Sequence, residues 1–173
     1  LLDNLAQERE LLAPLLEKST YIINTTDLNS SELKNRVREL FSTDSERERM
    51  GIVVRSFGFK YVLPLDSDLV LDVRFLPNPF YVEELRTQTG NDQAVVDYIC
   101  SYPQTFEYLK LEAKRFDFLI PQYINEGKSQ LVISVGCTGG QHRSVFVANK
   151  IYEYLSTQGY KVEVSHRELS NKK

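Results

Sequence analysis

The 173-residue sequence predicts an α/β protein with a mixed, partly parallel sheet and flanking helices. The apolar run "LVISV" (131–135) has the length and composition of a buried strand and leads into a glycine-rich loop. A helical pattern over 144–158, closed by a glycine, and an alternating strand over 160–165 follow. Strand, loop, helix and strand in this order form a βαβ unit, which implies a right-handed crossover and a parallel pairing of the two strands.

The first part of the chain is expected to be helical around one short strand. Residues 1–18 place leucines close to helical spacing, and "TYIIN" (20–24) has the composition of a strand. Asn29 stands three residues before Glu32 and ahead of an apolar face. This capping-box spacing predicts a helix that begins just after Asn29.

A change of domain is expected soon after this helix. The polar and charged run over 42–50 is typical of a linker. Helix, strand and helix alone cannot fill a core, so residues 1–45 are predicted to be the tail of one domain. Residues 46–173 are predicted to form a second domain that is long enough to bury a core of its own.

The second domain is expected to open with strands. The β-rich segments are "GIVVRSFGF" (51–59) and "DLVLDVRFL" (68–76). Two prolines and a glycine mark 77–90 as a loop, and helical patterns then start near Asn91 and near Pro103.

Charge and cysteine content exclude several classes of protein. The net charge is −3 and the pI about 5.5, although six Lys or Arg against three Glu make the stretch after residue 136 mildly basic. No signal peptide and no 18-residue apolar run occurs, and Cys100 and Cys137 are the only cysteines. A cytoplasmic protein without disulfides or membrane spans is expected. Of the possible zinc ligands only Cys137 and His142 lie close in sequence, so no metal site is predicted.

The segment "GCTGGQHRS" (136–144) is the strongest candidate site, because it leads from a strand into a helix. The first N–H groups of a helix have no partner within it, and glycines let the backbone approach a ligand closely. Arg143 adds a guanidinium suited to phosphate, His142 another donor, and Thr138 and Ser144 hydroxyls. The segment predicts a phosphate site. The alternative is a tight turn in which Arg143 pairs with a surface carboxylate.

The same segment has the spacing Cys-x5-Arg-Ser, which is that of the phosphate loop in cysteine-dependent phosphatases. In that interpretation Cys137 would attack phosphorus and Arg143 would hold the phosphate oxygens. Gly136 stands where those enzymes usually carry a histidine. The alternative is that Cys137 is a small buried residue with no reactivity.

A charged pair, Asp72 and Arg74, forms a second candidate site. Residues two apart on a strand project to the same face, so both would lie opposite Leu71, Val73 and Phe75, which are expected to enter the core. The pair could line a ligand site or could form an internal salt bridge, and the sequence leaves these alternatives open.

The basic C-terminal segment is a candidate RNA contact. His166, Arg167, Lys172 and Lys173 could bind RNA phosphates, or could simply be surface residues. The ten tyrosines are dispersed and form no aromatic RNA-binding signature.

Four motifs in this order resemble the YvcJ/RapZ family of bacterial proteins. They are "SFGFK" (56–60), "DVRFLPNP" (72–79), "TG" with Asp92 and the following helix, and "GCTGGQHRSV" (136–145). Members have an N-terminal P-loop nucleotide-binding domain and a C-terminal domain. The resemblance implies that residues 51–173 match the whole C-terminal domain.

The resemblance also implies functions. The full-length protein would bind and slowly hydrolyse ATP or GTP through a domain whose Walker A motif is not within this sequence, whereas this part needs no cofactor. In the RapZ branch the C-terminal domain senses glucosamine-6-phosphate, binds small RNA and recruits an endoribonuclease. Regulatory protein partners and a homo-oligomer are therefore expected. Carried over by position, the phosphosugar-binding residues would be Asp72, Arg74, Cys137, Thr138, Gly139, Gly140, His142 and Arg143.

The sequence departs from the RapZ branch at two places. That branch carries a histidine in the pocket after "PNP", where this chain has Phe80, and its C-terminal tail is more basic than "SHRELSNKK" (165–173). The chain resembles the YvcJ branch more closely. A ligand-sensing or adapter domain for a phosphorylated metabolite is the leading prediction.

Overall fold

The computed structural model describes residues 2–41 and 50–170, and the chain divides into two compact units, Leu1–Ser42 and Thr43–Lys173. Apart from Met50, which is fully buried, the expected linker over 42–50 lies outside the described residues. We describe each unit by itself.

The first unit contains two helices, α1 (Leu2–Lys18) and α2 (Ser30–Phe41), as predicted. The capping box is confirmed, because Asn29 Oδ1 accepts the N–H of Glu32 (3.0 Å) while Glu32 Oε2 accepts the N–H of Asn29 (2.8 Å). The strand predicted over 20–24 is wrong. A strand needs a neighbour to take its backbone hydrogen bonds, and the described residues of this unit supply only helices.

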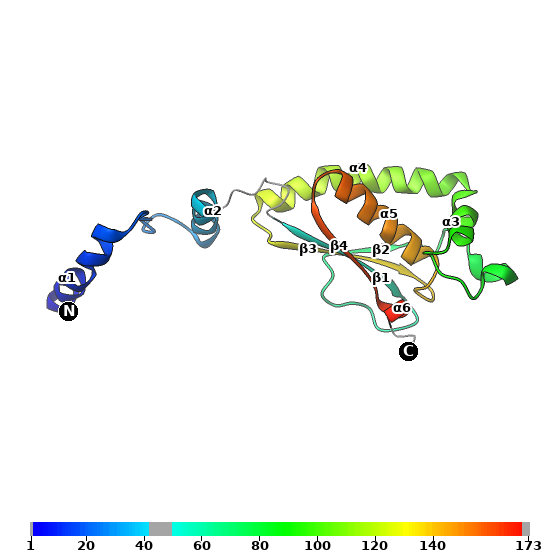
Figure 1. The fold of residues 1–173 in the computed structure, drawn as a ribbon, viewed down its shortest axis with the longest axis horizontal. Helices are drawn as coiled ribbons and strands as arrows, with labels where there is room; N and C mark the ends of the chain where they lie inside the picture. The colour runs from blue at the N-terminus through cyan, green and yellow to red at the C-terminus, as the bar shows by residue number, and fades with distance from the viewer. Residues whose placement is uncertain (1, 42–49, 171–173) are drawn as a thin grey trace. The chain divides into compact units, whose positions relative to one another are not determined.

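The second unit is built on a parallel sheet (Figure 1). Its strands are β1 (Gly51–Gly58), β2 (Leu69–Asp72), β3 (Gln130–Cys137) and β4 (Lys161–His166), in the order β2-β3-β1-β4. All three pairings are parallel. The predicted α/β class is confirmed, although β2 ends at Asp72 instead of extending to residue 76.

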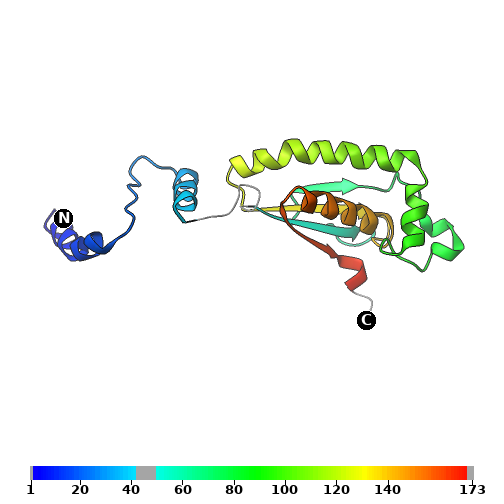
Figure 2. The same ribbon diagram turned by 45° about the horizontal axis from the view of Figure 1, so that its top comes forward.

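Helices cover one face of this sheet. Helix α5 (Arg143–Thr157) packs against β1, β3 and β4, and the longer helix α4 (Pro103–Asn125) lies beside it (Figures 1 and 2). Two 3-10 turns, η2 and η3, precede α3 in the segment predicted as loop. The bounds are η2 Pro79–Tyr81, η3 Glu83–Leu85, α3 Gln93–Cys100, α4 Pro103–Asn125, α5 Arg143–Thr157 and α6 Arg167–Ser170.

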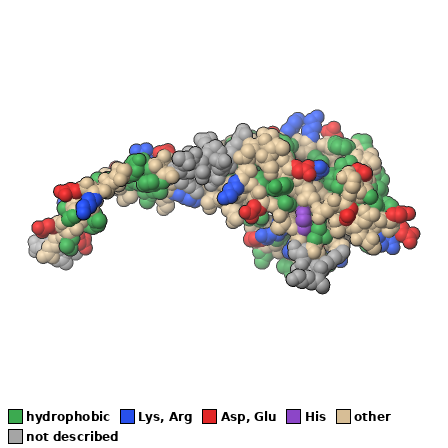
Figure 3. All heavy atoms as spheres, in the orientation of Figure 1, with side chains coloured by type: hydrophobic (Ala, Val, Ile, Leu, Met, Phe, Trp, Pro, Cys, Tyr) green, Lys and Arg blue, Asp and Glu red, His purple; other side chains and the backbone are tan. Residues whose placement is uncertain are grey.

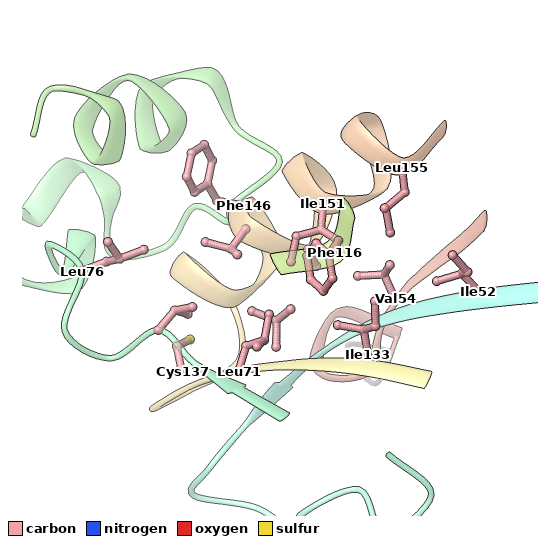
Figure 4. Close-up of a cluster of buried hydrophobic side chains, with 14 of the residues drawn as sticks. Ile52, Val54, Leu71, Leu76, Phe116, Ile133, Cys137, Phe146, Ile151 and Leu155 are labelled. Atoms are coloured by element: carbon pink, nitrogen blue, oxygen red, sulfur yellow. The ribbon is translucent and has the colours of Figure 1, made fainter. Parts of the chain in front are cut away.

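The core lies between the sheet and these helices. Alternate side chains of the strands, among them Ile52 and Ile133, face Phe116 of α4 and Ile151 of α5 (Figure 4). All four are almost completely buried. Burying a side chain of this size stabilises a fold by about 1.5–3 kcal/mol, so this layer holds the strand ends in place.

The connections cross the sheet on both faces. The β1–β2 connection runs over the face opposite the helices, where Ser67 Oγ lies 2.7 Å from Ser134 Oγ and Asp68 Oδ2 accepts the N–H of Val132 (2.8 Å). The β3–α5–β4 connection runs over the helical face. The predicted direct pairing of β3 with β4 is wrong, because β1 lies between them and hydrogen-bonds to both.

This topology predicts where on the sheet a ligand binds. The chain leaves the neighbouring strands β1 and β3 towards opposite faces, which makes their carboxyl ends a topological switch point. Ligands of open parallel sheets bind at such points. The glycine-rich loop follows β3 at this position.

The surface carries charges of both signs. Figure 3 shows Lys, Arg, Asp and Glu side chains interspersed with apolar ones on the visible face of the second unit. None of the helices in the described part of the chain is long and apolar enough to cross a membrane.

Candidate functional site

Two glycines allow the loops after β1 and β3 to touch through their backbones. Gly140 has a φ of 71°, in the left-handed region that favours glycine. A Cβ at Gly140 would lie 2.6 Å from the Gly58 nitrogen, and a Cβ at Gly58 would lie 2.8 Å from the Gly139 carbonyl carbon. Neither position has room for a side chain.

Backbone hydrogen bonds join the same two loops. The N–H of Phe59 donates to the carbonyl of Cys137 (2.8 Å), and the N–H of Lys60 donates to that of Thr138 (3.2 Å). From a third segment, the N–H of Gly90 donates to the carbonyl of Gln141 (2.8 Å). The glycine-rich loop is therefore fixed from two sides.

The buried side chain of Arg143 also fixes the loop. Its side chain is only 5% exposed, and Nη1 donates to the carbonyls of Arg74 and Leu76, the latter at 3.0 Å. Nη2 lies 3.5 Å from Thr138 Oγ1. Nε has no hydrogen-bond partner among the described residues. The partners are neutral oxygens and not the surface carboxylate of the alternative interpretation. Among the described residues Arg143 forms no ion pair, although its charge helps to lower the pKa of the Asp72 carboxyl.

Cys137 ends β3 and belongs to the cluster of buried hydrophobic side chains (Figure 4). The residue is 3% exposed. Sγ accepts the N–H of Gly140 (3.2 Å) and lies 3.2 Å from Ser144 Oγ. Burial and potential reactivity, the two alternatives for this residue, are both compatible with the geometry.

His142 is buried at the start of α5, at 8% exposure. Burial holds the pKa of its imidazole below the ordinary value, and backbone contacts from Leu85 and Gln88 oppose this only in part. The ring is therefore neutral at pH 7. Its Nε2 has no partner among the described residues, and in a neutral ring this nitrogen donates or accepts according to which of the two nitrogens carries the proton.

A cavity of about 320 Å³ opens over the loop. Five predicted site residues line it, whereas Asp72, Arg74 and Gly140 do not. Two of the lining residues are cationic, and none of the described ones carries a carboxylate. The lining residues are Lys60, Asn78, Phe80, Tyr81, Cys137, Thr138, Gly139, Gln141, His142 and Arg143.

Asp72 and Arg74 form an ion pair beside the cavity. Arg74 Nη2 lies 2.6 Å from Asp72 Oδ2, and this interaction holds the pKa of the carboxyl below its ordinary value. Because β2 ends at Asp72, the pair is made in the following turn and not on one strand face as expected. Val73 is buried as predicted, but Phe75 is 59% exposed, so its predicted place in the core is wrong. A ligand role for the pair stays a prediction.

Four lining residues were missed by the sequence analysis as ligand contacts: Lys60, Asn78, Tyr81 and Gln141. Lys60 follows the carboxyl end of β1, and only the strand order shows that this end adjoins the glycine-rich loop. Phe80 lines the cavity at the position where the resemblance places a pocket histidine, and Tyr81 follows it in η2.

Two of the candidate RNA-contacting residues, His166 and Arg167, make contacts within the fold. His166 Nδ1 lies 2.9 Å from Ser56 Oγ. Arg167 donates through Nε to Glu168 Oε1 (2.8 Å) and through Nη1 to the carbonyl of Val62. Lys172 and Lys173 lie outside the described residues.

Comparison with known proteins matches residues 50–170 to the family model of the RapZ C-terminal domain. A nucleotide-binding protein of Caldicellulosiruptor saccharolyticus is 49% identical over 98% of this chain and 58% of its own length. One of Alkaliphilus oremlandii is 48% identical over 96% of this chain and 57% of its own length. The chain thus spans less than two thirds of these relatives. It belongs to the RapZ C-terminal domain family, within a group of curated relatives named nucleotide-binding proteins.

Proposed function

We propose that the second unit is a ligand-sensing domain that binds a small phosphorylated metabolite in the cavity over residues 137–143. The observation that supports this most is the pair of buried polar atoms, His142 Nε2 and Arg143 Nε, that have no partner among the described residues. Both residues line the cavity. Buried polar atoms normally have partners: an oxyanion would accept from Arg143 Nε–H, and a ligand hydroxyl could pair with His142 Nε2 in either tautomer.

The charge of the site supports the same proposal. Lys60 and Arg143 bring two positive charges to a lining that holds no carboxylate among the described residues. The N-terminus of α5 adds its dipole, which favours negative charge. A phosphate monoester near −2 would match this charge. The family resemblance offers an amino-sugar phosphate such as glucosamine-6-phosphate as one example of such a metabolite, and an adapter role towards protein partners would follow from ligand binding.

Calorimetric titration of the 173-residue chain with inorganic phosphate and with glucosamine-6-phosphate tests the proposal. Lys60 and Thr138 are exposed at the cavity, so their replacement by alanine removes a charge or a hydroxyl without emptying the core. Each variant should weaken binding about fivefold. Lys161→Ala, an exposed lysine on β4, is the matched control and should bind as the wild type does. Absence of binding by every phosphate compound would refute the proposal.

A second candidate function, a cysteine-dependent phosphatase, is favoured by the contacts of Cys137 Sγ with Gly140 N–H and Ser144 Oγ. The thiolate would form an S–P bond as the ester P–O bond breaks and the leaving alkoxide takes a proton. Water would then hydrolyse the thiophosphate and regenerate Cys137. The wild type should release 4-nitrophenol from 4-nitrophenyl phosphate and Cys137→Ser should not. Equal rates from the two proteins would exclude this function.

The activity of the whole protein is a separate proposal. Because the curated relatives are named nucleotide-binding proteins, we propose that the full-length protein binds ATP or GTP through the part that lies outside this sequence. RNA binding stays a prediction that rests mainly on Lys172 and Lys173, and a gel shift at rising salt would test it.

A further inference from the structure

We propose that the cavity selects a phosphate monoester with a flat unsaturated ring, specifically a nucleoside monophosphate, and that Phe80 and Tyr81 determine this specificity. The inference deepens the proposed function and rests on it. It concerns the end of the cavity that is not occupied by the anion-binding loop.

The cavity has two chemically different parts. The loop 137–143 supplies the hydroxyl of Thr138, the imidazole of His142 and the guanidinium of Arg143. Phe80 and Tyr81 supply two aromatic rings that are 50% and 81% exposed although they line the same cavity. Aromatic faces bind nucleobases with little dependence on the base, so two exposed rings beside an anion site offer a stacking surface for a base.

The fold holds these rings in position. Pro79 is buried, and Asn78 Oδ1 accepts the N–H of Phe80 (3.4 Å) at the start of η2. Arg86 donates to the carbonyl of Phe80 (3.2 Å), and its guanidinium lies 5.3 Å from the centre of the Phe80 ring. The Phe80 and Tyr81 rings meet edge to face, 6.2 Å apart at an angle of 76°. The aromatic end is therefore preorganised around Phe80, with Tyr81 more open to solvent.

The charges argue against an amino sugar. An ammonium group is normally bound by a carboxylate, and the described lining contains none, while it does contain Lys60 and Arg143. The nearby carboxylate of Asp72 is paired with Arg74 and does not line the cavity. A nucleoside monophosphate carries its charge on the phosphate alone. Its base edge could pair with the amide side chains of Asn78 and Gln141, which also line the cavity.

The size of the cavity fits this class of ligand. Its volume of about 320 Å³ lies at the lower end of the range for small-molecule sites, roughly 300–1,000 Å³. Inorganic phosphate would fill only the loop end and leave the rings exposed. A ligand with a sugar and a base between the loop and η2 would reach both ends.

Calorimetry with the 173-residue chain separates the ligand classes. No Walker A motif lies within this sequence, so nucleotide binding would report on the cavity. The probes are AMP, GMP, CMP and UMP against glucosamine-6-phosphate, glucose-6-phosphate and inorganic phosphate. We expect at least one nucleotide to bind about tenfold more tightly than either sugar phosphate.

Variants test the rings directly. Tyr81→Ala should weaken nucleotide binding about tenfold and leave inorganic phosphate binding within about twofold, whereas Tyr81→Phe should retain nucleotide affinity. Tyr152→Ala, a tyrosine at the surface of α5 away from the cavity, is the control. Sugar phosphates that bind as tightly as every nucleotide, or a Tyr81→Ala variant with unchanged nucleotide affinity, would overturn the inference but leave the proposed function standing. Failure of all seven probes would overturn both.

Discussion

The cavity has a floor, residues 137–143, and a rim, Lys60, Phe80 and Tyr81, and the two differ in how they are held. The floor is mostly buried and is fixed through backbone contacts and through Arg143. The rim side chains are exposed. A buried floor must satisfy packing and binding at once, whereas an exposed rim can change with little effect on folding. We infer that the floor sets the chemistry of the bound group and the rim sets the identity of the ligand.

The largest expected effect is on the stability of the fold, and it distinguishes Gly140 from Gly139 in the floor. Gly140→Ala places a Cβ 2.6 Å from the Gly58 nitrogen and 2.7 Å from Glu168 Oε2, at a positive φ. Strain and overpacking together should lower the free energy of unfolding by about 3 kcal/mol. Gly139→Ala is the matched control, because a Cβ there meets no atom within 4 Å. Urea unfolding of both variants measures the difference, and equal stabilities would contradict a tightly packed floor.

Arg143→Lys should have the next largest effect. A lysine cannot reproduce the fork that donates to the carbonyls of Arg74 and Leu76, so buried acceptors lose their partners. The free energy of unfolding should fall by about 2 kcal/mol, and phosphate binding should weaken as well. Lys60→Ala on the rim should weaken binding with almost no change in unfolding. If both variants unfold like the wild type, the distinction between floor and rim fails.

Acid should weaken the fold before the carboxylates titrate. Burial lowers the pKa of His142 and of His166 in the folded protein. At pH values below the unfolded pKa, the unfolded chain therefore binds more protons than the folded one. Their contribution is complete above the unfolded pKa of about 6.5 and is lost as pH falls through the folded values. Urea unfolding at pH 7.5 and 5.5 should show the loss. His142→Gln with His166→Gln should reduce this pH dependence, and an unchanged slope would rule out the two histidines as its source.

The smallest expected effect on folding is at the rim. Phe80 and Tyr81 are exposed, so replacing either with alanine should change the free energy of unfolding by less than about 0.5 kcal/mol. A loss several times larger, measured by urea unfolding, would show that the rings belong to the folded core and are not available to a ligand.

The floor could be predicted from the sequence and the rim could not, for a physical reason. Strand, glycines and helix start are consecutive between Val135 and Ser144, so local pattern alone places the amides and Arg143 together. The rim residues come from two distant segments, after β1 and in η2. Their approach depends on the strand order, and the predicted β3–β4 pairing had that order wrong. Phe75 was misplaced for a related reason, because alternation was extended past the true end of β2 at Asp72.

Backbone amide NMR during a titration with inorganic phosphate tests the central claim most directly. If the floor is an oxyanion site, the resonances of Thr138, Gly139 and His142 should shift in a saturable way, while that of Lys161 on β4 should not. Shifts confined to scattered surface lysines, with the three floor amides unmoved at saturating phosphate, would contradict it.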